Sequence, residues 1–296
     1  MGEIKSKFAE LVFTKEEMKK RLIPTTYEIF MDTLQNKRGL DETIADDIAR
    51  AIKEWAIENK ATHFTHWFQP QRSGTAEKHD AFISYNGSGE IIEHFSSGQL
   101  IQSEPDASSF PSGGIRSTFE ARGYTAWDPT SPVFLREHDN GRSLIIPSIY
   151  LSWTGEALDM KTPLNRSMKA LNTNAIKLQR LLGNRVAKNI KVFSGLEQEY
   201  FLLPKDKIGS RMDLKICGRT VLGAEATKGQ LMEDHYFGSI QSKVMVFMND
   251  LEKELYRYGI PIKTKHNEVA PNQFELAPLY EEMNLAIDHN LETMEI

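Results

Sequence analysis

A short β-strand pattern with two acids on one face sets the strictest condition on how this chain folds. Residues Val192–Leu203 read as a strand that ends at Pro204. Residues two apart in a strand point to the same side, so Glu197 and Glu199 are expected to project together. Neighbouring carboxylates repel and raise each other's pKa unless a cation lies near them. This face must therefore meet either water or a cation, and a Glu-x-Glu pattern alone leaves both interpretations open.

A second acid-bearing segment, residues 266–276, is expected to join the first. Pro271-Asn272 interrupts it, so a turn or hairpin brings Glu268 and Glu275 back to one region. Acids on two such β segments are enough for two oxygen-rich sites, and Mg²⁺ or Mn²⁺ prefers oxygen ligands. Paired cations suit phosphoryl transfer, because they neutralise charge on the transferred group. His266 is more readily interpreted as a hydrogen-bonding neighbour or a surface histidine than as a ligand, since Mg²⁺ usually selects oxygen.

Other residues give weaker signals for chemistry. His63 and His66 have a spacing that suits zinc, but no cysteine or carboxylate cluster follows them, so a structural role is the favoured interpretation. Cys217 lies in a segment with no positioned histidine, and we interpret it as having no catalytic role. Neither a P-loop pattern nor a G-x-G-x-x-G pattern occurs, so the sequence does not support a P-loop or Rossmann nucleotide site.

Composition excludes several classes of protein. The net charge is −5, with 36 Lys and Arg residues against 41 Asp and Glu residues, which argues against binding nucleic acid through bulk positive charge. No apolar stretch approaches the roughly 20 residues that cross a bilayer, and the N-terminus has no signal-peptide core. One cysteine permits no intramolecular disulfide. We therefore expect a cytoplasmic protein that binds neither nucleic acid nor membrane.

The secondary-structure pattern predicts an α+β chain with three regions. Residues 1–60 read as helical, and Asp41 is a candidate N-cap for one of these helices. The apolar positions of that helix are Ile44, Ile48, Ile52 and Trp55. Residues 61–160 place frequent turn signals between short strand patterns, which is typical of a small β domain. Residues 161–296 mix helices and strands, and Gly183 ends the first helix. The apolar face of that helix contains Met168, Leu171, Ala175, Leu178 and Leu182.

The two acid-bearing segments together carry a family resemblance. Gly195–Phe201 followed by His266–Glu275 resembles the metal-binding core of glutamine synthetases. Longer strings are similar to the type III members of that family, namely Thr62–Pro70, Thr75–Asp80, Glu104–Gly114, Thr118–Pro129, Thr154–Asp159 and Glu233–Gly238. These strings are far more specific than the short carboxylate motif.

This resemblance implies an activity and a fold. The family forms glutamine from glutamate and ammonia, with ATP and two divalent cations, Mg²⁺ or Mn²⁺. The implied fold has a helical N-terminal addition, a β-grasp domain and the start of a catalytic domain with an antiparallel sheet. The implied assembly is a ring-shaped homo-oligomer.

The resemblance also assigns roles to single residues. Glu199, Glu268 and Glu275 match ligands of the cation nearer glutamate. Glu197 matches a ligand of the cation nearer the ATP phosphates. Asp106 matches an aspartate that binds ammonium and helps deprotonate it, although an alanine follows it where the family has glycine. A turn or helix-cap role is the alternative interpretation of Asp106.

In the family, further elements that contact substrate lie later in the sequence. Residues 1–296 contain no counterpart of these elements. The last helical pattern also lacks a stop signal, so we expect a truncated chain that is inactive alone. One alternative is a non-catalytic module that joins or regulates a full-length glutamine synthetase oligomer. Another is a different ATP-dependent phosphotransferase, such as a guanidino kinase, which the type III strings disfavour. A reading frame that continues past Ile296 would favour the ligase, and a stop codon there would favour the module.

Overall fold

The chain divides into two compact units. The computed structural model describes residues 3–36, 40–71, 77–105, 123–218, 221, 223, 236, 238–270 and 272–296. The N-terminal unit is Phe8–Val192, and the C-terminal unit is Phe193–Ile296 together with Met1–Lys7. Mixed helix and sheet, as predicted, is found in both units. The domain boundaries predicted from the sequence at residues 60 and 160 stay predictions. Among the described helices, none is long and apolar enough to cross a membrane.

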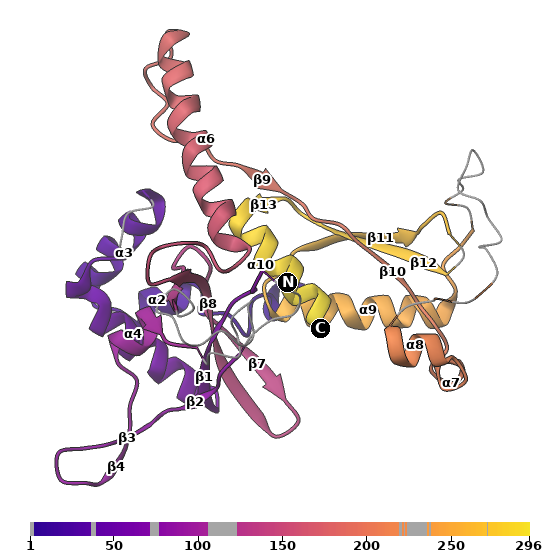
Figure 1. Cartoon of the computed structure of the whole chain (residues 1–296), viewed down its shortest axis with the longest axis horizontal. Helices are drawn as coiled ribbons and strands as arrows, with labels where there is room; N and C mark the ends of the chain where they lie inside the picture. Colours follow the sequence, from indigo (N-terminus) through magenta and orange to yellow (C-terminus); the bar gives the residue numbers. More distant parts are fainter. Residues whose placement is uncertain are drawn as a thin grey trace. The chain divides into compact units, whose positions relative to one another are not determined.

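The N-terminal unit is built on one mixed sheet (Figure 1). Its strands are β1 (Ala61–Trp67), β2 (Asp80–Ala81), β5 (Gln102–Ser103), β6 (Gly123–Trp127), β7 (Phe134–His138) and β8 (Gly141–Ser152). The order is β2-β1-β8-β6-β5, with β7 also paired to β8. Only the β1–β8 pair is parallel among these described pairs. A separate hairpin joins β3 (Ile83–Tyr85) to β4 (Ile91–Glu93).

The helices of this unit are α2 (Lys15–Arg21), α3 (Pro24–Asn36), α4 (Glu42–Glu58), α5 (Ser97–Ile101) and α6 (Lys161–Leu181). Helix α4 forms as the sequence predicts. The Asp41 side chain accepts a hydrogen bond from the Thr43 N–H at 2.9 Å, which satisfies a donor of the first turn. The predicted apolar positions Ile44, Ile48, Ile52 and Trp55 are all at most 4% exposed. Burial of this apolar face holds the helix in the unit.

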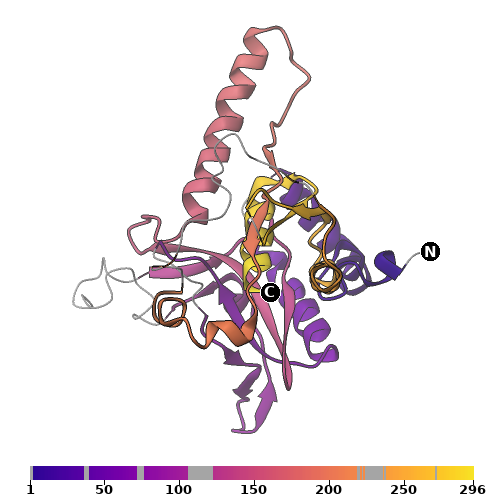
Figure 2. The ribbon, with the colours of Figure 1, turned by 90° about the vertical axis from the view of Figure 1, so that its right-hand side faces the viewer.

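Helix α6 is anchored at its first turn and exposed beyond it. The Asp159 carboxylate accepts the Thr162 N–H at 3.1 Å, and Lys161 forms a buried ion pair with Asp128 at 3.0 Å. Farther along, the helix projects from the sheet of its own unit with the returning chain beside it (Figures 1 and 2). Its predicted apolar face is therefore largely uncovered, and the exposed members are Leu171, Leu178 and Leu182. The chain then turns at Gly183 with φ of 89°, a conformation that favours glycine at a helix end.

The C-terminal unit packs a small antiparallel sheet on a long helix. Its helices are α1 (Glu3–Lys7), α7 (Lys205–Ile208), α8 (Met212–Cys217), α9 (Ser242–Arg257) and α10 (Met283–Glu295). Its strands are β9 (Phe193–Ser194), β10 (Gln198–Phe201), β11 (Ile262–Asn267), β12 (Gln273–Pro278) and β13 (Glu281–Glu282). The main sheet has the order β10-β12-β11. Val244 and Met248 of α9 pack with Phe274 of β12, so α9 covers one face of this sheet (Figure 1).

The strand predicted over residues 192–203 is divided, which corrects the sequence interpretation. β9 pairs with β13, whereas β10 pairs with β12, so the chain changes partner between Ser194 and Gln198. At Gly195 a Cβ atom would lie 3.3 Å from the Pro278 carbonyl oxygen. A glycine therefore permits the close backbone approach that the change of partner requires.

The buried ion pair under α6 gives a stability prediction. Burial would raise the pKa of Asp128, but the Lys161 charge and hydrogen bonds from Thr130 outweigh it and lower that pKa to about 2. Lys161→Met leaves a buried, unpaired carboxylate and is expected to reduce the unfolding free energy of the N-terminal unit by about 3–5 kcal/mol. Lys20→Met removes a mostly exposed ion pair with Glu17 and is expected to cost at most about 1 kcal/mol.

Urea unfolding followed by tryptophan fluorescence measures both variants. The N-terminal unit contains all four tryptophans, Trp55, Trp67, Trp127 and Trp153, so the signal is specific to that unit. Equal losses in the two variants would contradict the importance of the buried pair.

Candidate metal centre

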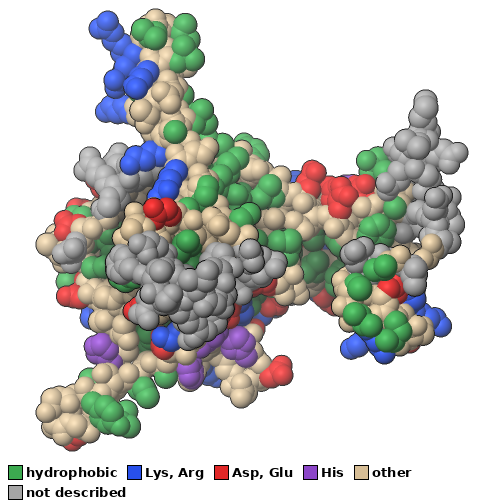
Figure 3. Space-filling view, in the orientation of Figure 1, with side chains coloured by type: hydrophobic (Ala, Val, Ile, Leu, Met, Phe, Trp, Pro, Cys, Tyr) green, Lys and Arg blue, Asp and Glu red, His purple; other side chains and the backbone are tan. Residues whose placement is uncertain are grey.

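The register of the C-terminal sheet places acids from two strands side by side. Glu199 of β10 lies directly opposite Glu275 of β12, and Glu275 lies directly opposite His266 of β11. Side chains of directly opposed residues share a face, so these three side chains lie on one side of the sheet. Figure 3 shows acidic side chains gathered over these strands. Because α9 covers the other face, the sheet separates its apolar packing from its acids.

Glu197 stays on the acid face although it precedes β10. Burial alternates residue by residue from position 191 to 201, with Glu197 and Glu199 both exposed. The partner change at β10 therefore does not disturb the period-two pattern. The Glu197 charge also raises the pKa of Glu275, so the two carboxylates interact electrostatically. Both acids that the sequence pairs on one face are thus found there.

Glu268 reaches the same cluster from the turn after β11. Its backbone N–H donates to the Gln273 carbonyl at 2.9 Å, and its side chain is 8% exposed. Ligand atoms of His266, Glu268 and Glu275 all lie within 4.8 Å of one another. His266 Nε2 is 3.2 Å from Glu275 Oε1, and His266 Nδ1 is 3.7 Å from Glu268 Oε1.

The electrostatics of this cluster favour the arrival of a cation. Burial is the largest cause that raises the pKa of Glu275, followed by its hydrogen bond to Glu268 and the charge of Glu197. The pKa of His266 is raised first by its hydrogen bond to the Asn267 carbonyl, and the charges of Glu275 and Glu268 add to this effect. Carboxylate oxygens dominate the donor set and one imidazole nitrogen adjoins them, which fits Mg²⁺ or Mn²⁺.

Gln273 is a site residue that our sequence analysis missed. Its Nε2 donates to Glu199 Oε2 at 2.9 Å. The signal was its position two residues before Glu275, which puts both side chains on one face of β12. Asp106, the other predicted site residue, lies outside the described residues.

His66 has the structural role that the sequence favoured. The side chain is buried, and its Nε2 donates to the Gln99 carbonyl at 2.9 Å. Its Nδ1 lies 3.0 Å from the Thr125 hydroxyl, which can donate to it. Both ring nitrogens therefore have protein partners. Cys217 is exposed, and the metal-competent cluster found among the described residues does not include it.

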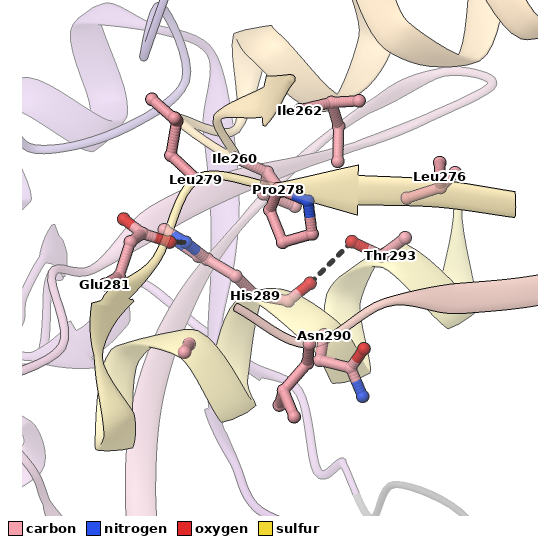
Figure 4. Close-up of a pocket in the computed structure, with 11 residues that line it drawn as sticks. Ile260, Ile262, Leu276, Pro278, Leu279, Glu281, His289, Asn290 and Thr293 are labelled. Atoms are coloured by element: carbon pink, nitrogen blue, oxygen red, sulfur yellow. Dashed lines mark hydrogen bonds and ion pairs between the residues drawn. The ribbon is translucent and has the colours of Figure 1, made fainter. Parts of the chain in front are cut away.

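A small cavity lies beside the sheet, between its strands and α10 (Figure 4). Apolar side chains such as Ile262 and Leu276 line it, and His289 pairs with Glu281 at 2.6 Å. The cavity offers about 10 Å³ for the centre of a water molecule, enough for about one water. It is a packing gap rather than a substrate site.

Two family models match the chain. Residues 4–167 match the model described as glutamine synthetase type III N terminal, which covers more than half of the chain. The chain belongs to the type III glutamine synthetase family. Residues 176–295 match the catalytic domain of glutamine synthetase, so the acid cluster lies in the part that resembles that domain. The family predicted from the sequence is therefore confirmed.

Curated relatives of this type III chain are considerably longer. The chain is 50% identical over 280 residues to a type-3 glutamine synthetase from Dictyostelium discoideum, covering 94% of this chain and 38% of that protein. It is 49% identical over 291 residues to a glutamine synthetase from Bacteroides fragilis (strain YCH46), covering 98% of this chain and 39% of that protein. The chain thus spans about two fifths of their length.

A solved structure shares the fold. The cryo-EM structure of Plasmodium falciparum glutamine synthetase superposes with a TM-score of 0.54 and 14% sequence identity. The match covers 83% of this type III chain and 47% of that one. At this level of identity the likeness concerns the fold alone.

The crowding around Glu275 predicts a stabilising substitution. Because its pKa is above the usual 4.5, the folded unit binds a proton there more readily than the unfolded chain. Stability from this group is greatest at low pH and declines as the pH rises through the raised pKa. Glu275→Gln is therefore expected to raise the thermal midpoint of the C-terminal unit at pH 7 in EDTA.

An added cation should reverse the order of the two thermal midpoints, so that the wild type melts at a higher temperature than Glu275→Gln. If Glu275 is a cation ligand, Mn²⁺ at 100 times its Kd is expected to stabilise the wild-type unit by about 2.7 kcal/mol and the Gln variant much less. Far-UV circular dichroism melts in EDTA and in Mn²⁺ measure both effects. A lower midpoint for Glu275→Gln in EDTA would show that the carboxylate stabilises the metal-free unit.

Burial of His66 predicts a loss of stability in mild acid. Burial lowers the pKa of His66 from its usual 6.5 to about 4. Between these pH values His66 is protonated in the unfolded chain and neutral in the folded unit. Its contribution to the unfolding free energy is therefore fully present above about pH 6.5 and is lost as the pH falls toward 4. The loss is on the order of 3 kcal/mol for the N-terminal unit.

Urea midpoints from tryptophan fluorescence at pH 7, 6, 5 and 4 measure this loss. His66→Gln should flatten the dependence, whereas His63→Asn, at an exposed position of the same strand, should leave it unchanged. A wild-type dependence that His66→Gln does not alter would assign it to other groups.

Proposed function

We propose that this chain is part of an ATP-dependent glutamate–ammonia ligase, which forms glutamine through γ-glutamyl phosphate. One observation carries the proposal: acids from separate segments meet on one sheet face, in the region that matches the glutamine synthetase catalytic domain. Phosphoryl transfer between two anions needs positive charge at such a place.

The acid cluster is proposed to hold two cations, Mg²⁺ or Mn²⁺. Glu199, Glu268 and Glu275 would hold the cation nearer glutamate. Glu197 would hold the cation nearer the ATP phosphates. When bound, the cations supply charge that draws the glutamate carboxylate and the terminal phosphate of ATP together. The family match and the geometry of the cluster support these assignments.

Other residues are proposed to prepare the acceptor and to orient the ligands. His266 pairs with both Glu268 and Glu275, so it restrains two carboxylates without adding negative charge. Asp106 is proposed to bind ammonium and to take a proton from it, which leaves neutral ammonia to attack the activated acyl carbon.

The finer fold and the assembly are also part of this proposal. The sheet of the N-terminal unit would correspond to a β-grasp domain preceded by a helical addition, and the sheet of the C-terminal unit to the start of the catalytic sheet. The working protein would be a cytoplasmic, ring-shaped homo-oligomer. Since the relatives are longer, we propose that glutamate and ATP also contact sequence beyond the matched region, and that residues 1–296 alone lack synthetase activity.

Glu199→Ala tests the function in the protein made from the whole reading frame that contains these residues. Glutamine formation from glutamate, ammonia and ATP, with Mg²⁺ or Mn²⁺, is expected to fall by at least about 100-fold, because a direct cation ligand is lost. The control is Thr264→Ala, an exposed position on strand β11 of the same sheet. Unchanged turnover and unchanged metal dependence in Glu199→Ala would contradict the assignment. A wild-type protein without synthetase activity would favour the non-catalytic module instead.

A further inference from the structure

Gln273 lies where one side chain can reach both acid-bearing segments. It is the first residue of β12 and lies directly opposite Phe201, two residues beyond Glu199 on β10. Side chains diagonal to each other on one sheet face are within reach when one of them is long. Gln273 also shares its face with Glu275, which lies two residues farther along the same strand.

The two ends of the Gln273 amide have different partners. Its Oε1 accepts the Ala270 N–H at 3.3 Å, and its Nε2 donates to Glu199 Oε2 at 2.9 Å. An amide offers one acceptor end and one donor end, and the Ala270 N–H can bond only to the acceptor. This contact therefore fixes which way the amide points and aims its donor at the carboxylate.

The Gln273 backbone ties the same group to the second acid segment. Its N–H donates to the Ala270 carbonyl at 3.1 Å, and its carbonyl accepts the Glu268 N–H at 2.9 Å. Asn272, just before it, has φ of 60°, a left-handed conformation that asparagine tolerates and that tightens the turn. Gln273 thus holds the turn that carries Glu268 while its side chain holds Glu199.

We propose that Gln273 is a positioning residue that fixes the Glu199 carboxylate for a divalent cation. The proposal rests on the proposed function, in which Glu199 is a cation ligand. Glu199 is exposed, so its side chain loses rotational freedom when a cation binds. A donated hydrogen bond reduces that cost and occupies one carboxylate oxygen, leaving the other for the cation. The amide is neutral, so unlike a lysine it does not repel the cation.

A double-mutant cycle separates this role from a purely structural one. The proteins are residues 1–296 as wild type, Glu199→Ala, Gln273→Met and the double variant, with Thr264→Ala as the exposed control. Mn²⁺ affinity is measured from the electron paramagnetic resonance signal of the free ion during titration. Circular dichroism melts in EDTA report whether each variant keeps its fold.

Gln273→Met is expected to weaken Mn²⁺ binding about 10-fold in the wild-type background, as is typical when a group that orients a metal ligand is lost. In the Glu199→Ala background it is expected to change the affinity less than about 2-fold, because its partner is already absent. Thr264→Ala should bind Mn²⁺ as the wild type does.

The outcomes distinguish the two hypotheses. Equal losses from Gln273→Met in both backgrounds, or no loss in either, would overturn the positioning role while leaving the metal site standing. A Glu199→Ala protein that binds Mn²⁺ like the wild type would instead overturn Glu199 as a ligand. A wild-type chain with no saturable Mn²⁺ binding would overturn the metal site itself.

Discussion

The main physical constraint on the C-terminal unit is the crowding of negative charge on one face of its small sheet. Glu275 lies directly opposite Glu199. Burial, a hydrogen bond to Glu268 and the charge of Glu197 raise its pKa. Such an arrangement is unfavourable for folding alone. The crowded acids lie in the part of the chain that matches the catalytic domain. Binding of a cation there would offset the free energy that their repulsion costs on folding.

The two-residue period of the strands allows the sheet to carry this charge. One face of β10 and β12 packs Tyr200 and Phe274 against α9, while the other face presents the acids. His266 and Gln273 are the polar neighbours on the acid face, and neither adds negative charge. The apolar packing against α9 and the candidate cation ligands therefore lie on opposite faces of the same few strands.

Features that depend on local sequence patterns were predicted correctly. Features that depend on pairing with residues distant in the sequence were not. The cap at Asp41 and the helix end at Gly183 follow from residue type, and both were found. The division between β9 and β10 depends on pairing with β13, which no pattern within residues 192–203 reveals. A helical period identifies the apolar face of α6 but not what covers it. Gln273 was missed because an amide two residues before an acid is ordinary in any strand.

The parallel pair of β1 and β8 imposes an order on folding during synthesis. β1 can pair early with nearby β2, but its other edge must wait until β8 has left the ribosome, because β8 follows every other strand of that sheet. Until then β1 exposes an unpaired edge, which other chains can use as a template for aggregation. Helix α1 waits longer still, since it belongs to the unit whose other residues, Phe193–Ile296, are made after those of the N-terminal unit.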